Sequence, residues 1–281
     1  MAKIKKIFLS SFAIIVATIL AYLAILRIPS NAQLSVNQSV IQKGALQCFN
    51  NKAAKPIDRN GELQVLVWNI YKQARENWHE TLEQYSHNTH LALLQEVSMT
   101  EQFKAYANSS AWFSSHVDAF SAFGVSSGVL TLSIQSPLVA CAHVEVEPWI
   151  LLPKSGIYSV FQLSDQRELV VVNVHAVNFT YGIEEYKQQI SALSAALTKH
   201  QGPVIFAGDL NTWSLERFAI IEIMLKQLGL IEVEFSPDNR TQFVNGMALD
   251  YIFYRELELV NALSPATDAS DHNPLVVKFR L

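Results

Sequence analysis

The 281-residue sequence contains little cysteine, glycine, proline or charge. Its two cysteines are too few for a disulfide framework or a four-cysteine zinc site. Ten glycines and nine prolines exclude a collagen-like or low-complexity chain. Only 16% of the residues are charged and 50% are hydrophobic, so the chain can bury a large core and is not disordered as a whole. Its length corresponds to one large domain or two small ones.

Positive charge is also scarce beyond the N-terminal segment. Residues 1–32 hold four of the 21 Lys and Arg residues and no acidic residue, which leaves 17 cations against 25 acids, a net charge of −8, for the rest of the chain. A protein that binds duplex nucleic acid through a broad basic face needs the opposite balance. The acidic remainder is compatible with a small anionic site held by a metal ion.

The longest hydrophobic run covers residues 7–26, which are uncharged and mostly apolar. A helix of about 20 residues is about 30 Å long, which is the thickness of a bilayer core. Three lysines precede the run, and this pattern keeps them in the cytoplasm while the rest of the chain crosses the membrane. We therefore predict a single anchor within residues 1–32, in the inner membrane, with the following domain on the periplasmic side.

Two alternatives to an uncleaved anchor stay open. Residues 30–32 (SNA) fit a small-x-small cleavage site, so residues 1–32 could instead be the signal peptide of a secreted protein. The run could also be a buried helix of a cytoplasmic protein, although it is apolar on every face.

The polar and irregular residues 33–61 are predicted to form a linker. Cys48 lies in this linker, and Cys141 lies in the domain that follows. A disulfide between them would fit an oxidising compartment, but two free thiols fit the sequence equally well.

Residues 62–281 are predicted to form one domain in which apolar runs rich in β-branched residues alternate with segments of helical spacing. The predicted strands are 63–67, 91–94, 129–132, 157–163, 169–174, 204–207, 251–254 and 275–279. The predicted helices are 76–86, 182–200 and 214–228. Because the strands are too many and too variably spaced for a simple βαβ array, we predict a mixed α/β (α+β) fold of two sheets flanked by helices and preceded by an N-terminal hydrophobic helix.

Polar side chains occur at the ends of several of these strands. They are Asn69, Gln95 and Glu96, His175, Asp209 and Asn211, Asp250, and Asp271 and His272. Each residue alone suits a turn, a helix cap or a structural hydrogen bond. Open α/β folds, however, place their sites at strand ends along one edge of a sheet. The joint occurrence of these residues therefore indicates a common functional site.

The segments that carry these residues resemble, in their order and spacing, the endonuclease/exonuclease/phosphatase superfamily. They are LVWNIYK (66–72), LLQEV (93–97), SGVLTLS (127–133), VVNVHAVNF (171–179), AGDLNTW (207–213), LDYIFYR (249–255) and SDHNPLVV (270–277). The resemblance covers nearly the whole domain and is closest to the bacterial YafD-like branch. It implies a deoxyribonuclease-I-like fold, which is a four-layer sandwich of two mixed β-sheets flanked by helices.

The resemblance also implies hydrolysis of a phosphate ester with a divalent cation, Mg²⁺ or its substitute Mn²⁺. Glu96 is the implied principal ligand, with Asn69 beside it and Asp271 completing the site directly or through water. Mg²⁺ is usually bound by one or two carboxylates, several waters and the substrate phosphate. Acidic residues alone would repel a phosphate, so the electrostatics require the metal.

The implied catalytic roles follow from the same motifs. Asp209 would take a proton from the attacking water, and His272 would bond a non-bridging phosphate oxygen. Asp250 would hold the other ring nitrogen of His272, fix its tautomer and raise its pKa. The implied catalytic residues are Asp209, His272, Asp250, His175 and Asn211, and the implied substrate-binding residues are Asn211, His175 and Asn178.

The sequence leaves the substrate open. We favour a nuclease-like phosphodiesterase that acts as a monomer; the alternatives are a phospholipid or phosphomonoester hydrolase and a catalytically silent binding or scaffold protein. The five aromatic residues Trp112, Phe113, Phe120, Phe123 and Trp149 could form an apolar surface beside the site for a lipid head group, but core packing is the favoured interpretation for them.

Overall fold

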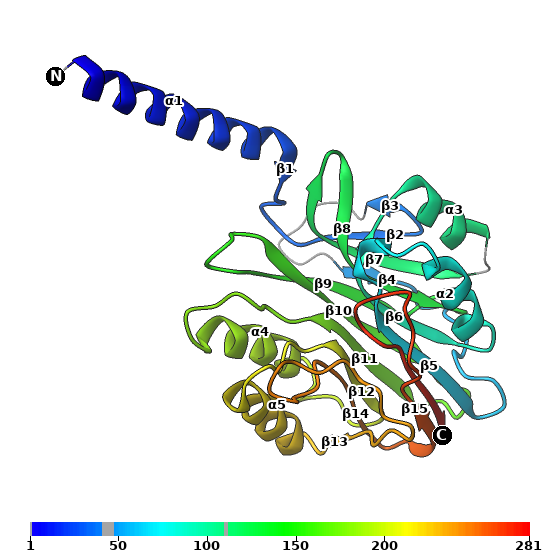
Figure 1. Cartoon of the computed structure of the whole chain (residues 1–281). Coiled ribbons are helices and arrows are strands. Elements are labelled where there is room, and N and C mark those ends of the chain that lie inside the picture. The colour runs from blue at the N-terminus through cyan, green and yellow to red at the C-terminus, as the bar shows by residue number, and fades with distance from the viewer. Residues whose placement is uncertain (1, 41–47, 110–111) are drawn as a thin grey trace.

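The computed structural model describes residues 2–40, 48–109 and 112–281, and two β-sheets form its centre (Figure 1). The first sheet has the order β15 (Glu258–Leu263), β16 (Leu275–Arg280), β5 (Glu62–Asn69), β6 (Leu91–Ser98), β8 (Val125–Ser133), β7 (Phe113–Ala122), β2 (Gln33–Val36) and β3 (Ser39–Val40), and β1 (Leu26–Arg27) pairs with β7. The second has the order β13 (Ile231–Glu232), β14 (Asp250–Arg255), β12 (Val204–Asp209), β11 (Glu168–His175), β10 (Pro153–Gln162), β9 (Val139–Val146) and β4 (Cys48–Asn50). Both sheets are mixed, because β5–β6 and β11–β12 are parallel pairs among antiparallel neighbours.

Helices cover the outer faces of both sheets. The first sheet packs against α2 (Trp78–Ser86) and α3 (Glu101–Ser109), and the second packs against α4 (Glu184–Ala195) and α5 (Leu215–Gln227). Successive side chains of a strand point to opposite faces. Val65 and Val67 of β5 therefore pack against the second sheet, while Leu66 and Trp68 pack against the helices. This confirms the predicted sandwich of two mixed sheets flanked by helices.

Three helices lie where the sequence predicts them. The predicted segments 76–86, 182–200 and 214–228 contain α2, α4 and α5. Ser214 is the N-cap of α5, and its side chain accepts a hydrogen bond from the Arg217 N–H. The structure adds elements that were not predicted, among them α3, β7, β9 and β15.

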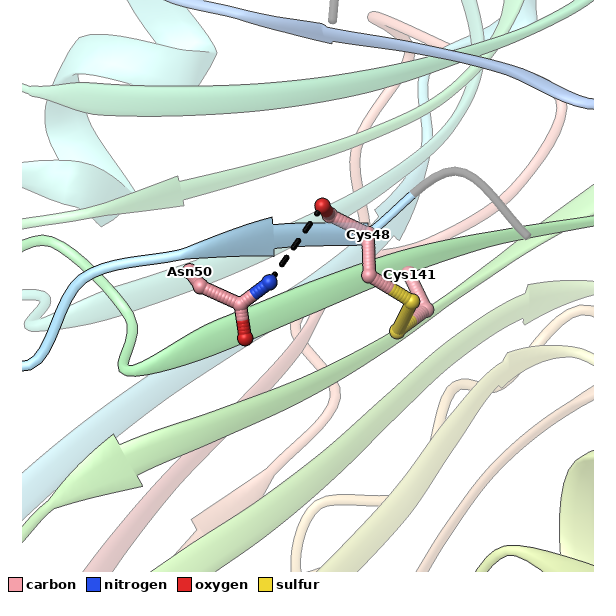
Figure 2. The surroundings of a disulfide bond; sticks show 3 residues. All are labelled: Cys48, Asn50 and Cys141. Carbon is pink, nitrogen blue, oxygen red and sulfur yellow. Dashed lines mark hydrogen bonds between the residues drawn. A yellow bond between two sulfur atoms is a disulfide. The ribbon is translucent and has the colours of Figure 1, made fainter. Parts of the chain in front are cut away.

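Part of the predicted linker, residues 33–61, contributes strands to both sheets instead. β2 pairs with β7, and β4 pairs with β9. These strands have two to four residues, which is too short for a recognisable alternation of apolar and polar side chains. Cys48 and Cys141 lie directly opposite each other in the β4–β9 pair and form a disulfide (Figure 2), so the two thiols are not free.

The N-terminal helix α1 (Ala2–Ile25) extends away from the sandwich (Figure 1). Several of its apolar side chains are exposed, among them Phe12, Ile14, Ile15 and Leu20. The membrane span predicted for residues 7–26 is not supported: over the part of the chain that the structure describes, no helix is both long and apolar enough to cross a membrane.

Candidate active site

A cavity of about 750 Å³ opens where the ends of β5, β6, β11 and β12 meet the start of β14. Seven of the nine predicted site residues line it, namely Glu96, His175, Asn178, Asp209, Asn211, Asp271 and His272. The other two lie directly behind this lining. Asn69 donates from Nδ2 to Asp209 Oδ2 over 3.0 Å, and Asp250 Oδ2 lies 2.7 Å from His272 Nδ1. The structure thus brings all nine residues to one place.

The register of the second sheet aligns three of these residues. In the parallel pair β11–β12, His175 lies opposite Asp209, and in the antiparallel pair β12–β14, Asp209 lies opposite Asp250. Gly208 makes this alignment possible. Its φ of 143° favours glycine, and a Cβ atom there would lie 1.9 Å from the Val174 carbonyl oxygen. The glycine of the AGDLN segment is therefore needed for the close approach of the two strands.

A β-bulge directs Glu96 into the cavity. The pairing of β6 with β8 shifts register between Leu94 and Val97, and Glu96 has a φ of 52°. A bulge re-aims a side chain that would otherwise follow the regular alternation of the strand. Asn211, on the facing side of the site, also has a positive φ, of 47°. Left-handed backbone at non-glycine residues is unfavourable and is concentrated at functional sites.

Two lysines surround the Glu96 carboxylate. Lys72 forms a close ion pair with it, and Lys154 Nζ lies 3.9 Å from Oε1. Burial raises the pKa of Glu96, but the charges of Lys154 and Lys72 outweigh this effect and lower the pKa below its ordinary value. Glu96 is consequently ionised at neutral pH, as a metal ligand must be.

His272 carries a positive charge inside the site. Burial alone would lower its pKa, but the charges of Asp250 and Asp209, the hydrogen bond with Asp250 and the charge of Asp271 raise it to about 10. His272 Nε2 lies 3.9 Å from Asp209 Oδ2. The imidazolium can therefore donate to a phosphate oxygen while Asp250 holds its other nitrogen.

The loop that carries His272 is fastened to the end of β5. Trp68 Nε1 donates to the His272 carbonyl over 2.8 Å, and the Ser270 hydroxyl donates to the Asn69 carbonyl over 2.7 Å. Ser270 Oγ also accepts from the His272 N–H. These bonds fix the C-terminal SDH segment against the N-terminal strand of the domain, far away in sequence.

His175 is neutral, unlike His272. Burial lowers its pKa well below the ordinary value, and the charge of Lys154 lowers it further. Its Nε2 lies 3.0 Å from Lys154 Nζ and 3.4 Å from Asp209 Oδ2. On this side of the cavity the positive charge therefore belongs to Lys154, which lies beside the neutral His175.

Arg217 organises the backbone that presents Asn178 and Asn211. It is fully buried, and its guanidinium lies 4.5 Å from the ring centroids of both Tyr186 and Trp213. The guanidinium donates to the carbonyls of Asn178 and Asn211 over 2.9 and 3.2 Å. It also donates to the Val177 carbonyl and to the Thr180 hydroxyl. Arg217 thus joins two loops of the site through one planar group.

Sequence reasoning missed Lys72, Lys154 and Arg217. Lys72 lies within the LVWNIYK segment, and that position could have suggested a role. Lys154 belongs to no recognised motif, and Arg217 occurs in a helix whose charged residues are ordinarily exposed to solvent. Only the packing of β10 and α5 shows that Lys154 and Arg217 lie at the site.

The two mixed β-sheets and their flanking helices define a class of protein by its fold, the α/β sandwich. The family model described as "Endonuclease/Exonuclease/phosphatase family" matches residues 66–272, and the chain belongs to this family. This confirms the superfamily predicted from the sequence segments and supports a hydrolase.

Relatives of known sequence and structure agree with this assignment. A UPF0294 protein from Vibrio parahaemolyticus is 46% identical over 277 residues, which cover 99% of each chain, and is consistent with the YafD-like branch. The catalytic domain of human nocturnin, solved with a bound sulfate anion, has a TM-score of 0.61 at 15% identity and covers 83% of this chain and 97% of its own. A family protein from Leptotrichia buccalis has a TM-score of 0.61 at 16% identity, over 78% of this chain and 100% of its own.

Proposed function

We propose that the protein is a metal-dependent phosphodiesterase, with Mg²⁺ as its ion and Mn²⁺ as a substitute. The observation that carries this proposal is the placement of Asp209. Its carboxylate lies between the charged pair of His272 and Asp250 on one side and the group of Lys154, His175 and Glu96 on the other. A carboxylate base in a cavity that also holds the cations His272 and Lys154 suits the attack of water on a phosphate ester, because the cations offset the negative charge of the phosphate.

The donor set of the cavity fits a hard cation. Glu96 and Asp271, which line the cavity, would hold the ion together with Asn69, whose side chain lies directly behind the lining, because Mg²⁺ prefers carboxylate and amide oxygens. When bound, the ion offsets charge on the phosphate oxygens. Ligand atoms of Asp209, Asp250 and His272 also lie within 4.8 Å of one another and could hold a metal. In this second group His272 Nδ1 and Asp250 Oδ2 are 2.7 Å apart and bound to each other, so we assign the group to the reaction itself.

The side chains of the chain itself account for the proton movements. Asp209 Oδ1 and Oδ2 accept hydrogen bonds from the Asn211 N–H and from Asn69 Nδ2, which fix the orientation of the carboxylate. Asp209 accepts one proton from water as the water oxygen bonds to phosphorus. The bond from phosphorus to the alcohol oxygen breaks, this oxygen takes up one proton from solvent water, and Asp209 then returns its proton to the solvent, so that a phosphomonoester and an alcohol result. His272 donates from Nε2 to a non-bridging oxygen, where negative charge accumulates.

Metal dependence tests this proposal. The full-length protein is expected to hydrolyse bis(4-nitrophenyl) phosphate in Mg²⁺ and to lose this activity in EDTA. Glu96→Gln should raise the Mg²⁺ concentration for half-maximal rate by at least about tenfold, because even indirect support of a metal ligand contributes that much to affinity. Glu101→Gln is the matched control, since that carboxylate is 91% exposed on α3. Equal Mg²⁺ requirements of Glu96→Gln and the control would remove Glu96 from the metal site.

We also propose that the domain functions on the periplasmic side of the inner membrane, with release as a secreted protein as the alternative. The disulfide between Cys48 and Cys141 supports this, because such bonds persist in oxidising compartments and are rare in the cytosol (Figure 2).

Thiol trapping in acid-quenched cells measures this directly. The wild-type protein should react with a maleimide-polyethylene glycol reagent only after reduction, whereas Cys48→Ser should expose one reactive thiol without reduction. Two thiols that react in unreduced wild-type protein would contradict the proposed location.

A further inference from the structure

Exposed apolar side chains surround the opening of the active-site cavity. We call Trp149, Ile150, Leu151, Phe179, Tyr181 and Phe243 the apolar rim; all six are exposed. Four of them line the cavity, and Leu151 and Tyr181 lie beside it on the same loops. The Trp149 and Tyr181 rings are 5.3 Å apart, which joins the β9–β10 loop to the loop after β11.

The rim is not explained by the fold. Of the aromatic residues considered from the sequence, Trp112 and Phe113 pack against apolar clusters of the sandwich, as core packing predicts. Trp149 and Phe123 do not, and they are exposed. Several exposed apolar side chains gathered around the opening of one cavity indicate an interaction site.

The charge pattern of the rim excludes a polyanionic strand as its partner. Proteins that bind single-stranded nucleic acid combine stacking aromatics with a positively charged groove that follows the backbone. The three rim segments 147–152, 178–182 and 242–247 contain no lysine or arginine. Lys72 and Lys154 lie inside the cavity, where both face Glu96. These two lysines are thus confined to the cavity, while the rim around it carries no cation and favours an apolar layer.

A second apolar element is attached to the same side. The arms of the β7–β8 hairpin line the cavity through Phe120 and Ser127, and Phe123 at its tip donates its N–H to the Ile25 carbonyl over 3.2 Å. α1, with its exposed apolar side chains, therefore leaves the sandwich next to this hairpin (Figure 1). Tryptophan and tyrosine suit the boundary between lipid and water, because each has an apolar ring and a polar group.

We propose that the apolar rim docks on a lipid surface and that the substrate is a phosphodiester in a lipid head group. The proposal rests on the proposed phosphodiesterase function. The rim contacts the apolar part of the lipid layer, and the phosphate enters the cavity between Lys154 and His272. Water attacks phosphorus as described above, and the bond to one ester oxygen of the lipid breaks.

The test compares two substrates with one protein. Full-length protein is given bis(4-nitrophenyl) phosphate in solution, and, separately, vesicles of phosphatidylethanolamine, phosphatidylglycerol and cardiolipin. The variant Leu151→Asn/Tyr181→Ser changes only rim residues outside the cavity lining, and asparagine tolerates the positive φ of Leu151. The matched control is Ile223→Ser/Ile231→Ser, whose two isoleucines are 57% and 56% exposed and do not line the active-site cavity.

We expect the rim variant to lose at least about tenfold in turnover of vesicle lipid, because two side chains no longer leave water on docking. Its turnover of the soluble diester and both activities of the control should stay within about twofold of wild type, since neither pair touches the catalytic residues. Unchanged vesicle turnover in the rim variant, or an equal loss on both substrates, would overturn the docking role. Hydrolysis of the soluble diester without hydrolysis of any vesicle lipid would overturn the lipid substrate and leave the phosphodiesterase intact. Absence of both activities in wild type would instead reject the proposed function.

Discussion

Replacing His272 with alanine is expected to lower kcat by on the order of 10²–10⁴, the usual effect of removing a side chain that transfers or shares a proton in the transition state. The protonated imidazole faces the position of the phosphate, and its charge compensates the negative charge that builds up there. Asp250→Asn should cause a smaller but still large loss, because an amide no longer favours the charged ring and can hold the wrong tautomer.

The two losses should be strongly non-additive, since Asp250 acts through His272. A double-mutant cycle in kcat on the soluble diester measures this coupling. Additive losses in log kcat would show that the two residues act independently.

The dependence of kcat on pH gives a second measurement of the Asp250–His272 pair. The pKa of His272 is about 10, so the charged form and the activity that depends on it persist up to that pH and decline above it. The Asp250 charge raises the pKa of His272 and burial lowers it, so the pKa falls when the Asp250 charge is removed. Asp250→Asn should therefore move the alkaline decline of kcat to lower pH. If kcat of Asp250→Asn declined at the same alkaline pH as that of the wild type, the decline would belong to a group other than His272.

Asp209→Asn is expected to lower kcat by a similar factor, on the order of 10²–10⁴, because an amide cannot accept the proton of the attacking water. The substitution nearly preserves shape, so the melting temperature should change little. Asp58→Asn is the matched control: Asp58 is also a buried carboxylate, but it accepts bonds from the backbone and hydroxyl of Ser164 and does not line the cavity. This control should lose stability and keep its turnover. A variant at position 209 with wild-type kcat would exclude Asp209 as the base.

The fold was predictable where strands form continuous apolar runs. Central strands such as β5 and β12 are buried on both faces, and their apolar runs are visible in the sequence. β9 escaped prediction because most of its residues are partly exposed on both faces, so neither a continuous nor an alternating pattern results. The apolar face of α3 consists of Phe103, Tyr106 and Ala107 alone, which is too little for a periodic signal.

The candidate site was predictable where a residue belongs to a motif at a strand end. Asp209 and His272 could be named in this way, and the structure places them at one cavity. Lys154 could not be named, because it reaches the site only through the pairing of two strands. β10 lies beside β11 with Gly156 opposite Val174, and this register places Lys154 next to His175. A contact that depends on the register between two strands cannot be predicted from the residues next to it in the sequence.

The strand register aligns His175, Asp209 and Asp250 inside a sheet, whereas the residues proposed to select the substrate lie in loops. The reacting groups are fixed by backbone pairing inside a sheet, where the insertion of one residue would turn every following side chain to the other face. The rim segments 147–152 and 178–182 are connections between elements, and insertions there leave the ladder intact. Evolution can therefore lengthen or replace the rim and acquire new substrates without rebuilding the hydrolytic apparatus, and the same freedom is open to protein engineering.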